Sequence, residues 1–173
     1  MKVFITDLKA RIKNDFSDIV SKLSKEDTNR LAHITNPSRR LQFLVGRAMI
    51  FDYFGSYFQI TPNGKPVSKK KDRYLSLAHS HQYVILAVCN QPVGIDIEKI
   101  SDKRNFEGIA KRLKFKENLS LEDFYQAFTA YEANFKLGSE IKAPYHHFFK
   151  WNDFMVCVAL KTEEKVEIIE TSI

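Results

Sequence analysis

Apolar and polar positions alternate in several short stretches of the chain, which is the pattern of β-strands. Residues 2–8, 74–80, 83–90 and 92–98 form such runs, and residues 145–170 have room for two or three more. β-branched and aromatic side chains dominate these runs, as they do in strands. The tripeptide Asn-Gln-Pro between the third and fourth runs predicts a tight hairpin turn.

Other stretches repeat their apolar residues at the spacing of a helix. This spacing predicts a long helix over residues 38–54 and a shorter one over about 105–116. Ser24 and Ser120 are expected to cap two further helices, the second of which stops at Gly138. The order of helix, strands, helices and strands predicts an α+β fold.

Size and composition indicate a chain that folds around a substantial core. Its 173 residues suit one domain or two small fused halves, and 44% of them are hydrophobic. The net charge of +6 favours an anionic partner, which could be a nucleic acid, a phosphorylated small molecule or an acidic protein.

The cysteines and the N-terminal segment indicate the cellular compartment in which the protein is expected. Cys89 and Cys157 lie in apolar strand-like runs, so we expect free buried thiols rather than a disulfide framework. The N-terminal segment lacks the apolar core of a signal peptide, and no apolar run is long enough to cross a membrane. These features predict a cytoplasmic protein.

Two carboxylates interrupt the apolar run Val-Gly-Ile-Asp-Ile-Glu. Because side chains two apart in a strand point the same way, Asp96 and Glu98 should share a face, with Ile95 and Ile97 packed behind it. Two acids this close repel each other unless a cation lies between them, and Mg²⁺ prefers such oxygen ligands. The alternative is a solvated strand edge that carries two harmless charges.

A third carboxylate lies in the helix that Ser120 begins. Glu132 and Lys136 are four residues apart and should occupy one helix face. They could form a simple surface ion pair. The neighbouring aromatic residues Phe124, Phe128 and Phe135 indicate instead a helix that is half buried.

Taken together, these blocks resemble the Sfp-type 4′-phosphopantetheinyl transferases. The family carries a Ser-His-Ser-type motif, then G-[IV]-D-[IV]-E, then a helix of the form W/F-x-x-K-E-A-x-x-K. "LSLAHSHQYVILAVCNQPVGIDIEKI" and "FTAYEANFKLG" match these in order and spacing over residues 75–138. "GKP" at 64–66 and "RRLQFLVGR" at 39–47 resemble family elements more loosely.

The resemblance implies a fold and a reaction. One domain over residues 1–173 would contain two similar halves, about 1–95 and 96–173, each a small antiparallel sheet packed with a long helix. The reaction would be the Mg²⁺-dependent transfer of 4′-phosphopantetheine from coenzyme A to a serine of an acyl or peptidyl carrier protein, releasing 3′,5′-ADP. A single chain would suffice as a monomer, with coenzyme A and the carrier protein as partners and with no nucleic acid or membrane.

The family motifs also imply roles for individual residues. Asp96, Glu98 and Glu132 would hold Mg²⁺, and Glu132 or a metal-bound water would accept the proton of the serine hydroxyl. Lys136 would contact the pyrophosphate of coenzyme A, so that Glu132 and Lys136 form the catalytic pair.

A second group of residues would bind the nucleotide end of coenzyme A. His79 would meet a phosphate of coenzyme A. Lys65 and Pro66, of the Gly-Lys-Pro element, would help to hold the nucleotide. Arg40 or Arg47 would meet the 3′-phosphate.

The sequence departs from the family pattern at two positions. Tyr131 stands where the family helix has a lysine, and Ala78 stands where its histidine motif begins with serine. These changes support an alternative, in which the chain is a weakened or inactive relative that binds carrier protein or coenzyme A. A basic nucleic-acid binder that uses the Lys-Lys-Lys-Asp-Arg run at 69–73 is the second alternative.

Overall fold

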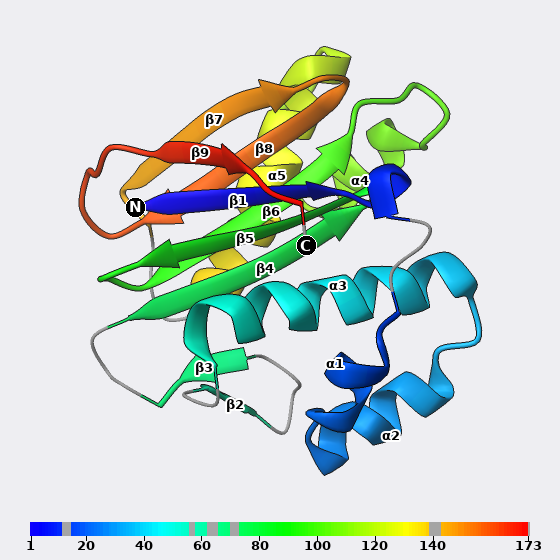
Figure 1. Ribbon diagram of the computed structural model, residues 1–173. Helices are drawn as coiled ribbons and strands as arrows, with labels where there is room; N and C mark the ends of the chain where they lie inside the picture. The colour runs from blue at the N-terminus through cyan, green and yellow to red at the C-terminus, as the bar shows by residue number, and fades with distance from the viewer. Residues whose placement is uncertain (12–14, 56–57, 62–65, 70–72, 139–142, 173) are drawn as a thin grey trace.

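The computed structural model describes residues 1–11, 15–55, 58–61, 66–69, 73–138 and 143–172. The helices are, in chain order, η1 (Leu8–Arg11, a 3-10 helix), α1 (Ser17–Ser21), α2 (Lys25–His33), α3 (Pro37–Phe54), α4 (Phe106–Arg112) and α5 (Leu121–Leu137). The strands are β1 (Lys2–Asp7), β2 (Phe58–Ile60), β3 (Pro66–Ser68), β4 (Tyr74–Ser80), β5 (Tyr83–Cys89), β6 (Val93–Lys99), β7 (Tyr145–Trp151), β8 (Phe154–Leu160) and β9 (Glu167–Glu170). Together they form a mixed α+β fold (Figure 1).

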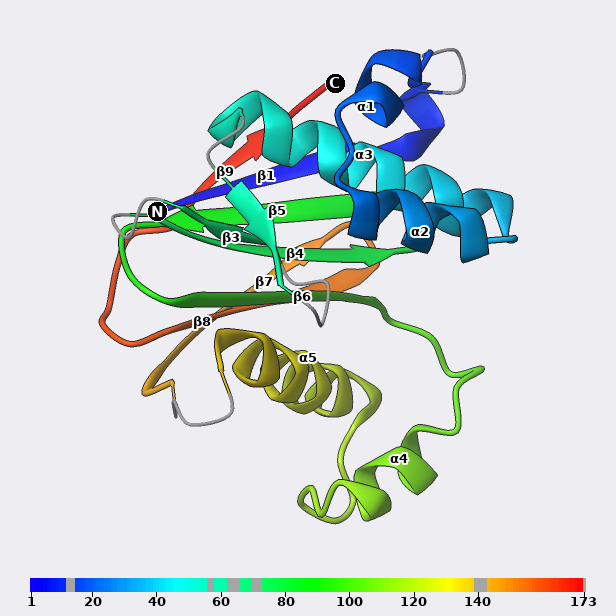
Figure 2. The same ribbon diagram turned by 90° about the horizontal axis from the view of Figure 1, so that it is seen from below.

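Most of the strands belong to two stacked sheets. The first sheet has the order β4-β5-β1-β9, the second has the order β6-β8-β7, and β2 pairs with β3 separately. Among the described strands, only β9 runs parallel to its neighbour, β1. Helix α3 covers the outer face of the first sheet and α5 covers the outer face of the second (Figure 2). The two long helices therefore enclose the sheets from opposite sides.

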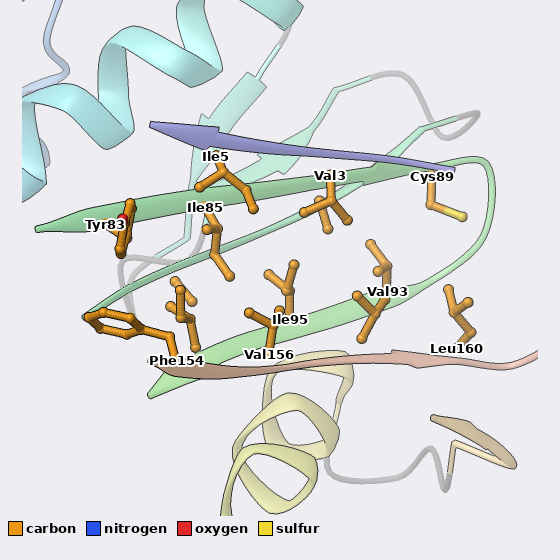
Figure 3. Close-up of a cluster of buried hydrophobic side chains, with 14 residues drawn as sticks. Val3, Ile5, Tyr83, Ile85, Cys89, Val93, Ile95, Phe154, Val156 and Leu160 are labelled. Atoms are coloured by element: carbon orange, nitrogen blue, oxygen red, sulfur yellow. The ribbon is translucent and has the colours of Figure 1, made fainter. Parts of the chain in front are cut away.

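The main core lies between the two sheets. Alternate residues of β1, Val3 and Ile5, pack with Ile95 of β6 and Val156 of β8, and all four side chains are fully buried (Figure 3). The intervening residue Phe4 points the other way and packs with residues of α3. The period of two in the sequence thus becomes two separate apolar layers, as a sheet covered on both faces requires.

The helix boundaries follow the expected capping residues. The Ser24 hydroxyl accepts the backbone N–H of Asp27 at 3.1 Å, and the Ser120 hydroxyl accepts that of Asp123 at 3.1 Å. Helix α5 ends at Leu137, directly before Gly138, as expected. Helix α4 stops at Arg112, four residues before the predicted end. No helix of the described part of the chain is long and apolar enough to cross a membrane.

The tight hairpin predicted between residues 83–90 and 92–98 is wrong. β5 belongs to the first sheet, whereas β6 lies in the second sheet and pairs with β8. Both strands are buried along most of their length, because each faces a helix on one side and the other sheet on the other side. Periodicity shows that such a run is a buried strand but does not show which sheet it joins.

Candidate active site

A cleft of about 1370 Å³ opens between the start of α3, the strand β4 and the end of α5. Its basic lining residues are Arg30, His33, Arg39, Arg47, His79 and Lys136, and no acidic residue of the described chain lines it. The N-terminus of α3 contributes Asn36 to the wall, and this end of a helix favours negative charge. The cleft is therefore suited to an anion that carries several charges.

The residues expected to bind the nucleotide end differ in their placement. His79 and Pro66 line the cleft. Arg40 does not line it, because its guanidinium donates to the carbonyl oxygen of Leu31 at 2.9 Å. Lys65 lies outside the described residues.

Arg47 lines the cleft but is bound to a buried carboxylate. Its Nε and Nη2 donate to the two carboxylate oxygens of Asp27 at 2.6 and 2.8 Å. The guanidinium also lies over the ring of Phe43, 4.7 Å from its centre. This arrangement joins α2 to α3 and neutralises the charge that was expected to meet a phosphate.

His79 lies among cations in the cleft wall. Partial shielding from water is the first cause that lowers its pKa, and the positive charges of Arg39 and Lys136 lower the pKa further. A neutral imidazole can still donate one N–H to a phosphate. His79 therefore suits hydrogen bonding better than charge neutralisation.

Sequence reasoning missed two arginines of the cleft, Arg30 and Arg39. Arg30 lies on a helix without a family motif, and Arg39 only begins the loosely matching element at 39–47, in which Arg40 and Arg47 were the expected ligands. An exposed basic residue on a helix is usually a solvated one. The only local signal was that Asn36 and Pro37 begin α3 and place Arg39 in its first turn.

At the end of the cleft formed by α5, Lys136 meets Asp96. The Lys136 ammonium lies 2.7 Å from Asp96 Oδ1, and the Asp96 side chain is only 9% exposed. The other oxygen, Oδ2, is buried without a hydrogen-bond partner among the described residues. Burial, with smaller contributions from the charges of Glu98 and Glu132, raises the pKa of Asp96 to about 6 despite the opposing charge of Lys136.

The expected arrangement of the strand that carries these acids is confirmed. Ile95 and Ile97 lie in the core between the sheets, while Asp96 points to the opposite side, toward α5. Glu98 is 20% exposed and its Oε2 lies 3.2 Å from Nη2 of Arg104. The structure thus brings Asp96, Glu98 and Lys136 into one region, and Glu132 of α5 lies near enough for its charge to act on Asp96.

Gly94 permits the close approach of α5 to β6. A methyl group placed on this glycine would overlap the carbonyl oxygen of Ala133 and would lie 2.8 Å from the backbone nitrogen of Leu137. Both are backbone atoms of α5, so they could move only with the helix. The absence of a side chain at Gly94 therefore sets the distance at which Lys136 reaches Asp96.

The strand of the acids is also tied to the wall of the cleft. The Ser76 hydroxyl of β4 accepts the backbone N–H of Ile95 at 3.1 Å, and Ser76 lines the cleft. Ala78, two residues further on, is buried in the core between the sheets. A serine at that position would therefore face the core and not the cleft.

The acids are held by cations of the protein itself. Lys136 contacts Asp96 and Arg104 contacts Glu98. In the described part of the chain, no three His, Cys, Asp or Glu side chains are grouped closely enough to hold a metal ion. The residues still fit Mg²⁺ in two respects: their donors are carboxylate oxygens, and one buried oxygen of Asp96 has no partner.

Comparison with known proteins adds to this description. No family model matches the chain. Over 96 residues the chain is 30% identical to the "4′-phosphopantetheinyl transferase gsp" of Aneurinibacillus migulanus, and the match covers 50% of this chain and 40% of that protein. The match confirms the resemblance that the motifs predict, and this chain is related to a 4′-phosphopantetheinyl transferase over about half of its length.

Proposed function

We propose that the protein transfers 4′-phosphopantetheine from coenzyme A to a serine of an acyl or peptidyl carrier protein and releases 3′,5′-ADP. The observation that carries this proposal is a cleft lined by basic side chains that ends at the Asp96–Lys136 pair. Coenzyme A carries a diphosphate and a 3′-phosphate, so it needs such positive charge. The name of the partial relative supports the same reaction.

In this proposal the cleft holds the nucleotide end of coenzyme A. Arg39 and His79 bind the 3′-phosphate, and Lys136 turns from Asp96 to the diphosphate. Phosphoryl-type transfer depends mainly on positioning and on neutralising charge. The basic residues of the cleft provide both.

Asp96, Glu98 and Glu132 would hold Mg²⁺ beside the diphosphate. When bound, the ion would withdraw charge from the phosphate oxygens and stabilise the leaving group. Oδ2 of Asp96 supports this assignment, because it has no hydrogen-bond partner in the described part of the chain and a buried anionic oxygen without a donor is costly.

The proposed step forms one bond and breaks one bond. The serine oxygen of the carrier protein bonds to the phosphorus that bears the pantetheine, and Glu132 accepts the hydroxyl proton. The bond from that phosphorus to the bridging oxygen breaks, and 3′,5′-ADP leaves with that oxygen and its electron pair. Lys136 neutralises the charge that develops on the departing phosphate.

We propose further that the chain consists of two similar halves with the cleft between them. The first half would hold α3 with the sheet of β4, and the second would hold α5 with the sheet of β6. The lining residues come from segments 29–79 and 135–138, which supports a site shared between halves. A single chain would then be sufficient for activity.

Mass spectrometry of purified carrier proteins tests the reaction. With coenzyme A and Mg²⁺ present, we expect a carrier serine to gain the mass of one phosphopantetheine arm, and 3′,5′-ADP to appear in equal amount. Asp96→Ala, Glu98→Ala and Glu132→Ala should each abolish the gain.

Controls separate this function from its alternative. Asp153→Ala removes an exposed acid in the turn between β7 and β8, whose carboxylate lies 3.3 Å from the Lys99 ammonium, and should transfer normally. Binding of carrier protein or coenzyme A without a mass gain on any carrier would instead support a binding module. The substitution of Tyr131 for the family lysine favours that second candidate.

A further inference from the structure

Arg104 lies in the segment between β6 and α4 and contacts the acidic strand and α5 at once. Its Nη2 lies 3.2 Å from Oε2 of Glu98. Its guanidinium lies over two rings of α5, 5.9 Å from the centre of Tyr125 and 5.4 Å from that of Phe128. No family motif includes this residue.

Two aromatic rings of α5 restrict the position of the guanidinium. Arginine stacks on aromatic faces through its planar group, and the two rings restrict where that group can lie. The hydroxyl of Tyr125 also donates to the backbone oxygen of Ser101 at 3.0 Å, which ties the segment of Arg104 to α5. Arg104 is therefore held by contacts with α5 as well as by its contact with Glu98.

The position along α5 links Arg104 to the third acid. Phe128 and Glu132 are four residues apart, so they lie on the same face of α5, one turn from each other. Arg104 thus joins Glu98 of β6 to the part of α5 that carries Glu132. The contact uses one carboxylate oxygen of Glu98, and a carboxylate can bind a metal ion through its second oxygen.

We infer that Arg104 is a positioning residue, which orients Glu98 relative to Glu132 for a divalent cation. The inference rests on the proposed function, because it takes Glu98 and Glu132 as metal ligands. Groups that hydrogen-bond to metal ligands typically change metal affinity by about 10- to 100-fold when they are removed.

Two effects of removing Arg104 act in opposite directions, which makes the inference testable. If the arginine only adds positive charge, its loss reduces repulsion and tightens the binding of a cation. If it orients Glu98, its loss weakens binding. Replacement by lysine keeps the charge but loses the planar stacking and the fork of donors.

The test is a calorimetric titration of Mg²⁺ into the EDTA-treated, dialysed full chain. We expect about 10-fold or more weaker binding for Arg104→Met, and weaker binding for Arg104→Lys as well. Lys99→Met is the matched control, because Lys99 adjoins Glu98 in sequence, is 38% exposed, and pairs instead with Asp153 at 3.3 Å. It should bind Mg²⁺ as the wild type does.

Three results would overturn the inference. These are equal or tighter Mg²⁺ binding by Arg104→Met, wild-type affinity in Arg104→Lys, and no Mg²⁺ binding by the wild type. Melting temperatures measured in EDTA show whether each variant folds, independently of Mg²⁺ binding. If Arg104→Met does not fold, the Mg²⁺ affinity of Arg104→Lys alone tests the inference. Carrier modification by the wild type, measured in parallel, shows whether the proposed function stands when the inference fails.

Discussion

The molecule contains two acid–base pairs near the cleft that look alike in composition and differ in geometry. Asp27 and Arg47 are 2% and 4% exposed, and the arginine binds both carboxylate oxygens. Asp96 and Lys136 are 9% and 28% exposed, and the lysine binds one oxygen while the other is buried and meets no hydrogen-bond partner among the residues that the structure describes. The first pair is complete, whereas the second is not.

This difference separates a structural pair from the pair that we propose to take part in the reaction. The bidentate pair joins two helices, and each oxygen of its carboxylate accepts a hydrogen bond from the guanidinium. In the other pair a buried carboxylate keeps an unused oxygen, and a flexible lysine reaches the same cleft. Incomplete pairing is costly for stability, and such cost is common where a protein must later bind something else.

The largest expected effect comes from breaking the complete pair. Asp27→Ala leaves Arg47 buried without a counter-charge, so we expect a loss of about 3–5 kcal/mol in the free energy of unfolding, measured by urea denaturation. The double variant Asp27→Leu/Arg47→Met should lose much less. A loss below about 1 kcal/mol in the single variant would show that the pair is not structural.

A smaller effect, on the pH dependence of the free energy of unfolding, is expected at the Asp96–Lys136 pair. The pKa of Asp96 is about 6 in the folded protein, above its ordinary value of 3.8, because burial disfavours the charged form. The folded state therefore binds more protons between these values, and stability should fall as pH rises from about 4 to about 6. Above that range the wild type should have lost up to about 3 kcal/mol.

Asp96→Asn tests this expectation. In EDTA the variant should lack this pH-dependent loss of stability. Above pH 6 its free energy of unfolding should exceed that of the wild type. The difference should be less than about 3 kcal/mol, because Lys136 loses the charge of its partner. Urea denaturation at a series of pH values measures it. Parallel stability curves for both proteins would contradict the raised pKa.

The smallest effect distinguishes two neighbouring arginines. Arg39 lines the cleft, whereas Arg40 donates to Leu31 and does not line it. We expect Arg39→Ala to weaken coenzyme A binding by about 5- to 10-fold, near 1 kcal/mol, because one charge-assisted hydrogen bond is lost. Arg40→Ala should bind coenzyme A normally. Calorimetric titration of coenzyme A into both variants measures the two affinities. A larger loss of affinity in Arg40→Ala than in Arg39→Ala would instead assign the 3′-phosphate to Arg40.

Much of the fold could be predicted because its signals are local. Ser24 and Ser120 cap helices where expected, and the alternation around Ile95 and Ile97 correctly placed Asp96 on the opposite face. The sheet membership of β6 could not be predicted, since buried strands look the same in either sheet.

The acids of the candidate site could be predicted from the sequence, but the residues that pair with acids near the cleft could not. The order of motifs placed Asp96 and Lys136 near each other, and the structure adds that they touch. The pairing of Arg47 with Asp27 joins residues of two helices that show no shared pattern in the sequence. Such contacts depend on tertiary packing, which local patterns do not report.

At Gly94, both the packing of α5 on β6 and the position of the candidate site residues on α5 depend on the absence of a side chain. Even an alanine there would force the backbone of α5 outward, since the obstructing atoms belong to the helix itself. Side chains carried on that face would retreat together, including Glu132 and Lys136, to which we assign roles in the proposed transfer. A chain altered at this position would therefore lose the proposed activity without any change in the side chains to which we assign it.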